Sequence, residues 1–272
     1  MQSRPGVRKS VPEKLNAGIA TRMVLWTLCL VLISAAVFAS AQDKGKDKDK
    51  AKPPAAQMVD SGSFGVFMAG RRVATETFSI HQDNDGSSIT SEFKSEAGVD
   101  RAVQSSDLEL AITGDLRKYE WHETSPGESQ AVVVPSESFL MERFSKNPQE
   151  KPHEQPFLLP ASTSMLDDYA FIQREVLAWR YLATSCKQEK GQLQCPLKQG
   201  TQLGTLNPHA RASMPVTVQY SGREKIPLHG VEHELIRLDL KSDVGDWTLW
   251  LDDQLKLQRI LDPTDNTEVV RD

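Results

Sequence analysis

The amino-acid sequence predicts a mainly β protein, in which a curved antiparallel sheet (an open half-barrel) wraps around one long central helix. Three observations support this fold class. From about residue 58 to the C-terminus, short stretches alternate apolar and polar residues, which is typical of strands with one buried face. After the N-terminal region, residues 164–183 have a long helical pattern. Helices do not alternate with the strands, and this excludes a doubly wound parallel sheet.

Residues 1–41 have the three parts of a secretory signal peptide. Residues 1–22 carry five basic residues and one acid, residues 23–38 carry no charge, and Ala39-Ser40-Ala41 is a typical cleavage end. The alternative is an uncleaved anchor in the inner membrane, formed by residues 23–41. Sixteen helical residues span about 24 Å, which is short of the roughly 30 Å hydrocarbon core. Cleavage is therefore favoured, and it predicts an exported protein that is periplasmic or extracellular.

Residues 42–57, QDKGKDKDKAKPPAAQ, alternate lysine and aspartate before two prolines. Such a segment cannot bury apolar area, so we expect a disordered linker. Residues 58–272 then form a single antiparallel β domain. Without the charges of residues 1–41 the net charge is about −9, which offers no electrostatic footprint for nucleic acid.

The β domain is expected to contain about eleven to thirteen short strands. The first hairpin turns at Ala69-Gly70-Arg71, and a later one turns at Ser125-Pro126-Gly127. Residues 147–156, NPQEKPHEQP, are polar with three prolines and predict a loop. Further strand patterns follow the helix, among them PVTVQY and KIPLHG, and Asp252-Asp253-Gln254 makes the last major turn.

The predicted helix over residues 164–183 is apolar around most of its circumference. Ser164 is the expected N-cap, with Asp167 three residues later. Asp167, Arg174 and Glu175 mark the side expected to face water. A helix with so little polar surface is largely enclosed by the rest of the protein.

Two interpretations of this helix remain open. It is either a core helix packed on the sheet or a helix that lines an apolar cavity. In the second case Gln173 and Arg180, one above the other between two apolar stripes, are the polar anchors for a ligand head group. The apolar contacts would come from the adjoining stripe, which includes Tyr169, Val176 and Trp179.

Cys186 and Cys195 flank the segment KQEKGQLQ. If Lys190 and Gly191 form a two-residue turn, the two cysteines fall opposite each other at a non-hydrogen-bonded pair, where side chains are closest. An exported protein meets an oxidising compartment, so a hairpin disulfide is predicted. The C-x-x-C spacing of redox-active pairs is absent from the sequence.

The sequence contains no recognisable catalytic constellation. His229 and His233 invite a metal-site interpretation, but they lie on a predicted strand, where residues four apart are separated by about 13 Å. The S-x-x-K match at Ser91–Lys94 lacks its companion motifs, and there is no G-x-S-x-G, Walker loop or H-E-x-x-H. We therefore expect a protein without catalytic residues, metal or cofactor, although a hydrolase is not excluded.

Parts of the chain resemble known proteins. GVFMAGRRVATETFSI, the helix after Leu159-Pro160 and the closing WTLWLDDQLKLQRILDP and EVVRD resemble uncharacterised exported bacterial proteins of the cell envelope. The closing strands also look like those of periplasmic lipoprotein carriers. That resemblance implies an open, strongly curved antiparallel barrel that holds helix inside and binds acyl chains.

The sequence therefore leads to two hypotheses for function. The first is binding of a lipid or another hydrophobic or amphipathic ligand within the half-barrel, since a concave apolar interior is a usual ligand site. The second is a protein-interaction or envelope-assembly module, with an envelope protein as partner. Such a module would use an exposed strand edge or residues 147–156.

Overall fold

The computed structural model describes residues 56–96, 101–147, 149–189 and 192–272, which belong to one compact unit, Lys52–Asp272. A second unit, Met1–Ala51, lies outside the described residues. The predicted signal peptide and nearly all of the predicted linker therefore lie outside them too. Within the described residues, no helix is long and apolar enough to cross a membrane.

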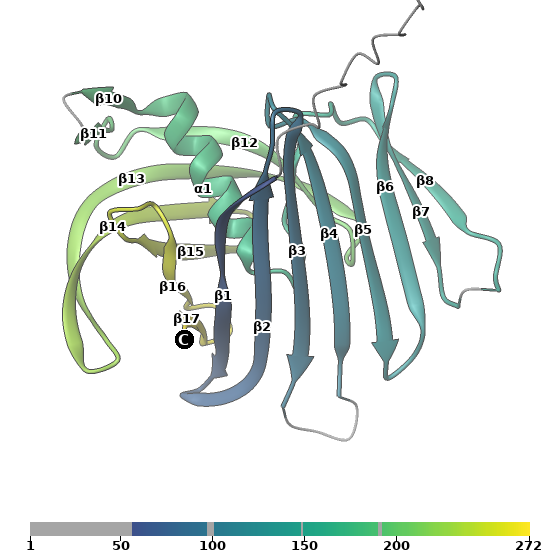
Figure 1. Ribbon diagram of the computed structural model, residues 1–272, viewed down its shortest axis with the longest axis horizontal. Helices are drawn as coiled ribbons and strands as arrows, with labels where there is room; N and C mark the ends of the chain where they lie inside the picture. The colour runs from purple at the N-terminus through teal and green to yellow at the C-terminus, as the bar shows by residue number, and fades with distance from the viewer. Residues whose placement is uncertain (1–55, 97–100, 148, 190–191) are drawn as a thin grey trace, which may run out of the picture. The chain divides into compact units, whose positions relative to one another are not determined.

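The described residues form seventeen strands and one α-helix (Figure 1). The helix is α1 (Ile172–Ser185). The strands are β1 (Gln57–Met68), β2 (Arg71–Gln82), β3 (Gly86–Ser95), β4 (Val103–Ala111), β5 (Leu116–Ser125), β6 (Ser129–Ser136), β7 (Phe139–Ser145), β8 (His153–Phe157), β9 (Ser164–Met165), β10 (Lys187–Glu189), β11 (Gln192–Gln194), β12 (Gly200–Asn207), β13 (Ala212–Leu228), β14 (Val231–Ser242), β15 (Gly245–Leu251), β16 (Leu257–Asp262) and β17 (Thr267–Arg271).

Fifteen of these strands form one large sheet in the order β8-β7-β6-β5-β4-β3-β2-β1-β17-β16-β15-β14-β13-β12-β9. Its pairs are antiparallel apart from the short β9, which runs parallel to β12. β8 and β9 end the order and do not pair with each other, so the sheet of the described residues is not closed. The predicted mainly β, antiparallel fold class is thus confirmed.

The strands are more numerous and less regular than predicted. The stretch PVTVQY and the first four residues of KIPLHG, expected as two strands, belong to the 17-residue β13, and His229 and Gly230 form the turn after it. A bulge between Tyr220 and Gly222 lets β13 continue through an irregular point, and Gly222 has the positive φ of 108° that favours glycine. The second half of the predicted loop 147–156 is the edge strand β8, whose Pro156 needs no ladder donor on the free side.

The prediction of a long helix over residues 164–183 is wrong at its start. α1 has 14 residues and begins only at Ile172. The preceding residues pair with a strand instead: β9 pairs with β12, and the amide of Leu166 donates to the carbonyl of Leu206 at 2.9 Å. An amide bonded to a neighbouring strand is not available to a helix, so helical structure starts only beyond this pairing.

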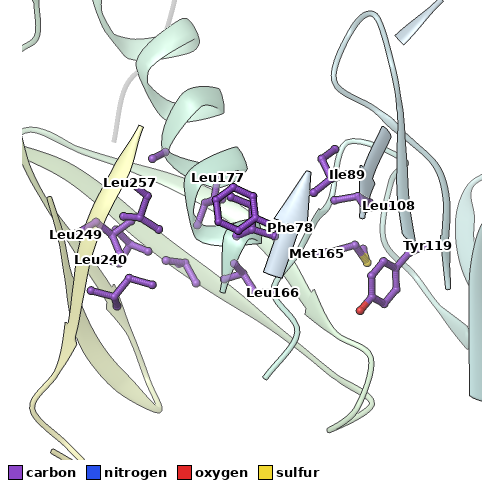
Figure 2. Close-up of a cluster of buried hydrophobic side chains, with 14 of the residues drawn as sticks. Phe78, Ile89, Leu108, Tyr119, Met165, Leu166, Leu177, Leu240, Leu249 and Leu257 are labelled. Carbon is purple, nitrogen blue, oxygen red and sulfur yellow. The ribbon is translucent and has the colours of Figure 1, made fainter. Parts of the chain in front are cut away.

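The helix and the sheet share one hydrophobic core (Figure 2). Figure 2 shows Leu166 and Leu177 between two groups of side chains from distant parts of the sheet. One group includes Ile89 and Leu108, and the other includes Leu240, with each of these side chains 2% exposed or less. Burying each such side chain contributes about 1.5 to 3 kcal/mol. Side chains therefore fill the space between helix and sheet over this stretch.

The predicted hairpin disulfide is confirmed. Cys186 and Cys195 are joined, with their Cα atoms 4.3 Å apart. They flank the two-stranded sheet of β10 and β11, in which Lys187 pairs with Gln194. The predicted turn residues, Lys190 and Gly191, lie outside the described residues.

Reducing this disulfide should lower the free energy of unfolding by about 2 to 3 kcal/mol, because it releases a short loop in the unfolded chain. The loop is short since the two cysteines are 9 residues apart. Urea unfolding with and without dithiothreitol measures the difference. The double variant Cys186→Ala/Cys195→Ala should be insensitive to dithiothreitol, and a reductant effect that persists in it would contradict the prediction.

Candidate ligand-binding cleft

The first turn of α1 is capped by a carboxylate from a distant strand. Glu76 of β2 is fully buried, and its oxygens accept hydrogen bonds from the amides of Phe171 at 2.9 Å and Ile172 at 3.3 Å. The hydroxyl of Ser91 donates to it at 2.6 Å. Burial raises the pKa of Glu76 to about 7, although these hydrogen bonds favour its charged form. The predicted N-cap, Ser164, is wrong because it lies in β9.

Beside this capped end lies a cleft of about 440 Å³. Its walls are the segment 168–174 and the strands β1, β2, β3, β15, β16 and β17. Most of its lining is apolar and much of that is aromatic, including Met68, Phe93, Tyr169, Phe171, Trp247 and Ile260. Both its volume and its lining are typical of a small-molecule site.

Arg174 forms part of the cleft wall, but its charge is already engaged. Its side chain is buried, and its guanidinium donates to the carbonyls of Asp167 and, at 3.1 Å, Ala170. It also lies 4.6 Å from the ring centre of Trp247 and 5.2 Å from that of Phe171. Burial lowers the pKa of Arg174. The residue therefore stiffens the wall by holding both rings.

The rim of the cleft is polar. Asp168, Asp262 and Asp265 line it. Asp262 and Asp265 each accept a hydrogen bond from a backbone amide two residues later, and Asp168 accepts one from the side chain of Asn207. The indole N–H of Trp247 donates to Asp262 and so orients the ring in the wall. An apolar interior with a polar rim suits a ligand that has an apolar body and a polar group.

A cluster of polar side chains lies buried next to the cleft. We call Gln104, Tyr119, Trp121, Asp167, Gln173 and His209 the polar cluster. Asp167 is its centre: one carboxylate oxygen accepts from the hydroxyl of Tyr119 and contacts Nδ1 of His209 at 2.8 Å. The His209 ring stacks on Trp121 at 3.9 Å between ring centres. Burial, followed by the charge of Asp167, raises the pKa of Tyr119 well above its usual value.

Several atoms of the polar cluster are buried without a hydrogen-bond partner among the described residues. They are Gln104 Oε1, Trp121 Nε1, Gln173 Nε2 and His209 Nε2. Such atoms are rare in folded proteins because each opposes folding by about 1 to 3 kcal/mol. Because several such atoms belong to one cluster, the polar cluster is a candidate binding site rather than ordinary core packing.

A cavity of about 10 Å³ lies inside the polar cluster, lined by Gln104, Tyr119, Trp121, Asp167 and Tyr169 among others. Tyr169 borders both this cavity and the cleft. Its ring packs edge-on against Phe93 at 5.2 Å and lies 4.9 Å from the centre of His209. One tyrosine ring therefore separates the apolar cleft from the polar cluster.

Glu142 of β7 is a further buried carboxyl close to His209. It is fully buried, and neither oxygen has a hydrogen-bond partner in the part of the chain that the structure describes. Burial raises the pKa of Glu142 to about 7, while the charges of Arg211 and His209 act in the opposite direction. At neutral pH this carboxyl is therefore close to half protonated.

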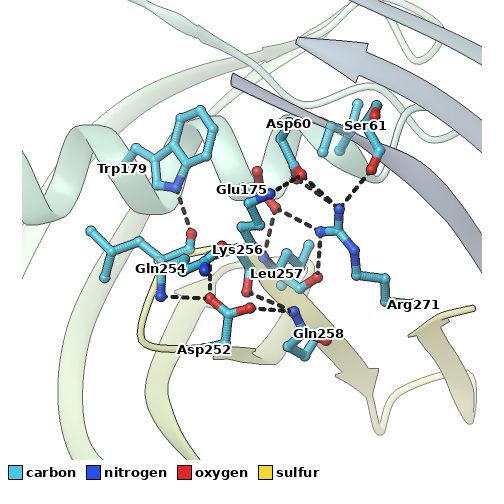
Figure 3. Close-up of polar contacts among 12 residues, drawn as sticks. Asp60, Ser61, Glu175, Trp179, Asp252, Gln254, Lys256, Leu257, Gln258 and Arg271 are labelled. Atoms are coloured by element: carbon cyan, nitrogen blue, oxygen red, sulfur yellow. Dashed lines mark hydrogen bonds and ion pairs between the residues drawn. The ribbon is translucent and has the colours of Figure 1, made fainter. Parts of the chain in front are cut away.

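A second polar network joins the first turn of α1 to the two ends of the domain (Figure 3). The Arg271 guanidinium contacts both oxygens of Asp60, at 2.8 and 2.9 Å, and lies 3.7 Å from Glu175. Lys256 contacts Asp60 at 2.9 Å, and the amide of Leu257 donates to Glu175 at 2.6 Å. This network ties β1, β16, β17 and α1 together, and its residues do not line the cleft.

The two carboxyls of this network titrate in opposite directions. Burial alone would raise the pKa of Asp60, but the hydrogen bonds from Lys256 and Arg271 outweigh it and lower that pKa. Burial raises the pKa of Glu175 to about 8, and the negative Asp60 beside it adds to the rise. The network therefore favours the ionised form of Asp60 and the protonated form of Glu175.

The five predicted ligand residues are not gathered at one site. Tyr169 lines the cleft, whereas the Gln173 side chain is buried in the polar cluster and accepts from the amide of Asp167 at 2.7 Å. Val176 packs half-buried against the core. The indole of Trp179 donates to the carbonyl of Leu255 at 2.6 Å. Arg180 reaches the carbonyl of Gly114 and the hydroxyl of Ser164, at 3.4 and 3.5 Å.

The side of the helical segment predicted to face water is instead buried. Asp167, Arg174 and Glu175 are 1%, 3% and 0% exposed. Each has polar partners from other elements or from the turn before α1, and these replace water around the charge. The prediction failed because several of those partners, such as Tyr119 for Asp167 and Leu257 for Glu175, are distant in sequence.

Several residues of the cleft and the polar cluster were not predicted from the sequence. The local sequence gives no site signal for the aromatic residues Phe93, Trp121 and Trp247, because aromatic residues on strands usually belong to the core. The polar residues around His209 give no such signal either. A weak signal was present for Glu76, a charged residue at an otherwise inward position of β2.

Two other hollows are more polar. One of about 810 Å³ lies beside the disulfide hairpin and is lined by Tyr220, Ile236 and the ion pair of Arg223 with Asp253, among others. Another, of about 530 Å³, lies on the outer face of β2–β5 among hydroxyl and carboxyl groups such as Thr90 and Asp107. Within the described residues, no group of histidine, cysteine and acidic side chains could hold a metal ion.

Fold and site together define a mainly β protein with one large, open antiparallel sheet and an apolar cleft at the start of its helix. No family model matches the chain, and a search of curated proteins found no match. Among solved structures it is similar to a beta-barrel-like protein of a domain of unknown function, DUF1849, from Brucella abortus. The match covers 78% of this chain and 93% of that chain, with 8% identity and a TM-score of 0.48.

Proposed function

We propose that this protein binds a small amphipathic molecule, with the apolar part of that molecule in the 440 Å³ cleft. The protein acts as a binder rather than an enzyme, in a half-barrel formed by the sheet around α1. We also propose that the protein is exported to the cell envelope. The periplasmic lipoprotein carriers that its closing strands resemble bind acyl chains there. A lipid is then the natural class of ligand.

The cleft carries this proposal. Its aromatic and aliphatic side chains come from seven separate parts of the chain and surround a space, whereas the core beneath is filled. Met68 remains 46% exposed at the rim, and its flexible thioether adapts to varied apolar partners. Moving such surface out of water on ligand binding provides the driving force.

The test is a titration with N-phenyl-1-naphthylamine, an uncharged probe that fluoresces in apolar surroundings. We expect saturable binding by the folded protein. Thr267 lines the cleft, so Thr267→Trp should fill part of it and weaken binding at least about tenfold. The matched variant Thr90→Trp lies on the opposite face of the sheet and should bind the probe like the parent protein.

Native mass spectrometry of protein purified from its exported location adds a second measurement, since we expect a co-purifying lipid. Equal probe affinity in the parent protein and Thr267→Trp would show that the probe binds elsewhere. That result, with no lipid found, would contradict the proposal.

Protein interaction is the second candidate function, and the free edge of β8 favours it. Among the residues that the structure describes, β8 is the last strand in the sheet order and pairs with β7 alone, so its other side offers backbone groups to a strand of a partner. Crosslinking in the native envelope from a photoreactive residue at Glu154 should then capture a protein partner. Crosslinks to lipid from the cleft, without protein crosslinks from β8, favour the first function.

A further inference from the structure

We infer that the polar cluster behind Tyr169 binds the head group of the cleft's ligand, and that this head group is a single uncharged hydroxyl. The inference rests on the proposed function, because it concerns the ligand of the same cleft. It assigns a specificity-determining role to Gln104 and Trp121.

The unpaired atoms of the polar cluster indicate that a polar group binds there. Gln104 and Trp121 line the small cavity, are at most 4% exposed, and each has a buried polar atom with no partner among the described residues. A buried polar atom without a partner opposes folding, since it has lost its hydrogen bonds to water. Two such atoms at one cavity are explained when a bound group completes their hydrogen bonds.

The kinds of atoms specify the group. Trp121 Nε1 is a donor, whereas Gln104 Oε1 is an acceptor. A hydroxyl both donates and accepts, so it satisfies both atoms. A carboxylate would be repelled by Gln104 Oε1 and by nearby Asp167, and an ammonium group has no acceptor for the N–H of Trp121. Either ion would also lose its solvation.

The size of the cavity agrees with this assignment. Its volume of about 10 Å³ is close to the lower limit for one water-sized group. Tyr169 borders both the cavity and the cleft, so the group enters from the cleft beside its ring. The ligand is therefore a neutral amphiphile with a terminal hydroxyl, such as a long-chain alcohol or an acylglycerol.

The test compares 1-octanol with 1-methoxyoctane, which accepts hydrogen bonds but cannot donate one. Displacement of N-phenyl-1-naphthylamine from the mature protein reports both affinities. We expect octanol to bind at least about fivefold more tightly than methoxyoctane, the value of one buried hydrogen bond. In Gln104→Leu and Trp121→Phe this ratio should fall toward one, whereas Thr90→Trp, which lies on the opposite face of the sheet, should keep the ratio of the parent protein.

A structural role for these residues would give a different result. If Gln104 stabilised the fold, Gln104→Leu would lower the midpoint of thermal unfolding without ligand. The head-group role predicts an unchanged or higher midpoint, because an unpaired buried amide is removed. A lower midpoint, or an unchanged ratio of octanol to methoxyoctane in both variants, would overturn the inference while cleft binding stands. Absence of any probe binding in the parent protein would instead show that the proposed function is wrong.

Discussion

Replacing Arg271 by methionine should lower the free energy of unfolding by about 3 to 5 kcal/mol. Arg271 is 13% exposed and holds both oxygens of Asp60, whose side chain is completely buried (Figure 3). Methionine keeps an apolar stem of similar length and removes the guanidinium. Asp60 then keeps Lys256 as its charged partner but loses the two bonds from Arg271. A buried carboxylate that has lost such bonds is strongly destabilising.

Urea unfolding of the parent protein and the variant measures the effect. The matched control is Arg143→Met, since Arg143 also pairs with a carboxylate at 2.9 Å but both side chains are about half exposed. Exposed pairs contribute at most about 1 kcal/mol. Equal effects of the two substitutions would contradict the account. Asp60→Asn combined with Arg271→Met should recover part of the lost stability, because residue 60 is then uncharged and no longer needs the two hydrogen bonds that Arg271 donated.

The strands were predictable because their signal is local. Alternation in β2 and the turn at Ala69 and Gly70 depend on neighbours in the chain, and both are present in the structure. The disulfide was predictable for the same reason, since a short hairpin places Cys186 opposite Cys195. A prediction from local sequence is correct where the tertiary contacts favour the same backbone conformation.

The start of the helix was not predictable from local patterns. Ser164 has the side chain of an N-cap, but its backbone pairs with β12. The actual cap, Glu76, is 95 residues from the amide of Phe171. When the capping side chain comes from a strand that is distant in sequence, the residues next to the helix do not indicate where the helix begins.

Charge was also misleading as a sign of exposure. Asp167, Arg174 and Glu175 looked like the wet side of the helix, yet each is buried among partners such as Tyr119, Trp247 and Arg271. Burial of a charge requires partners that are brought together only by the fold. The cleft has the same origin, because its walls come from segments that are far apart in the sequence.

Raising the pH from 5 to 9 should lower the free energy of unfolding, and Glu175→Gln should remove a large part of this loss. Burial raises the pKa of Glu175 to about 8 in the folded protein, against an ordinary glutamate pKa of 4.5. Below both values the acid is protonated in both states, and its full contribution to stability is present. As the pH rises, the unfolded chain ionises first, and stability falls until the pH passes the folded pKa. Each pH unit in this window costs about 1.4 kcal/mol, which totals about 3 to 5 kcal/mol.

Glutamine reproduces the protonated acid, because its carbonyl can accept from the amide of Leu257 and its NH₂ can donate toward Asp60. The variant should therefore match the parent protein near pH 5 and exceed it in stability near pH 9. Burial also raises the pKa of Glu76 and of Glu142 to about 7, but both are present in parent and variant and cancel in the difference. The control is Glu154→Gln on the exposed edge, which should leave the slope of unfolding free energy against pH unchanged.

Parallel curves of unfolding free energy against pH for the parent and Glu175→Gln would mean that Glu175 is ionised in the folded protein. Arg271 would then be the partner of two buried carboxylates. In that case Arg271→Met should lower the free energy of unfolding by more than about 3 to 5 kcal/mol.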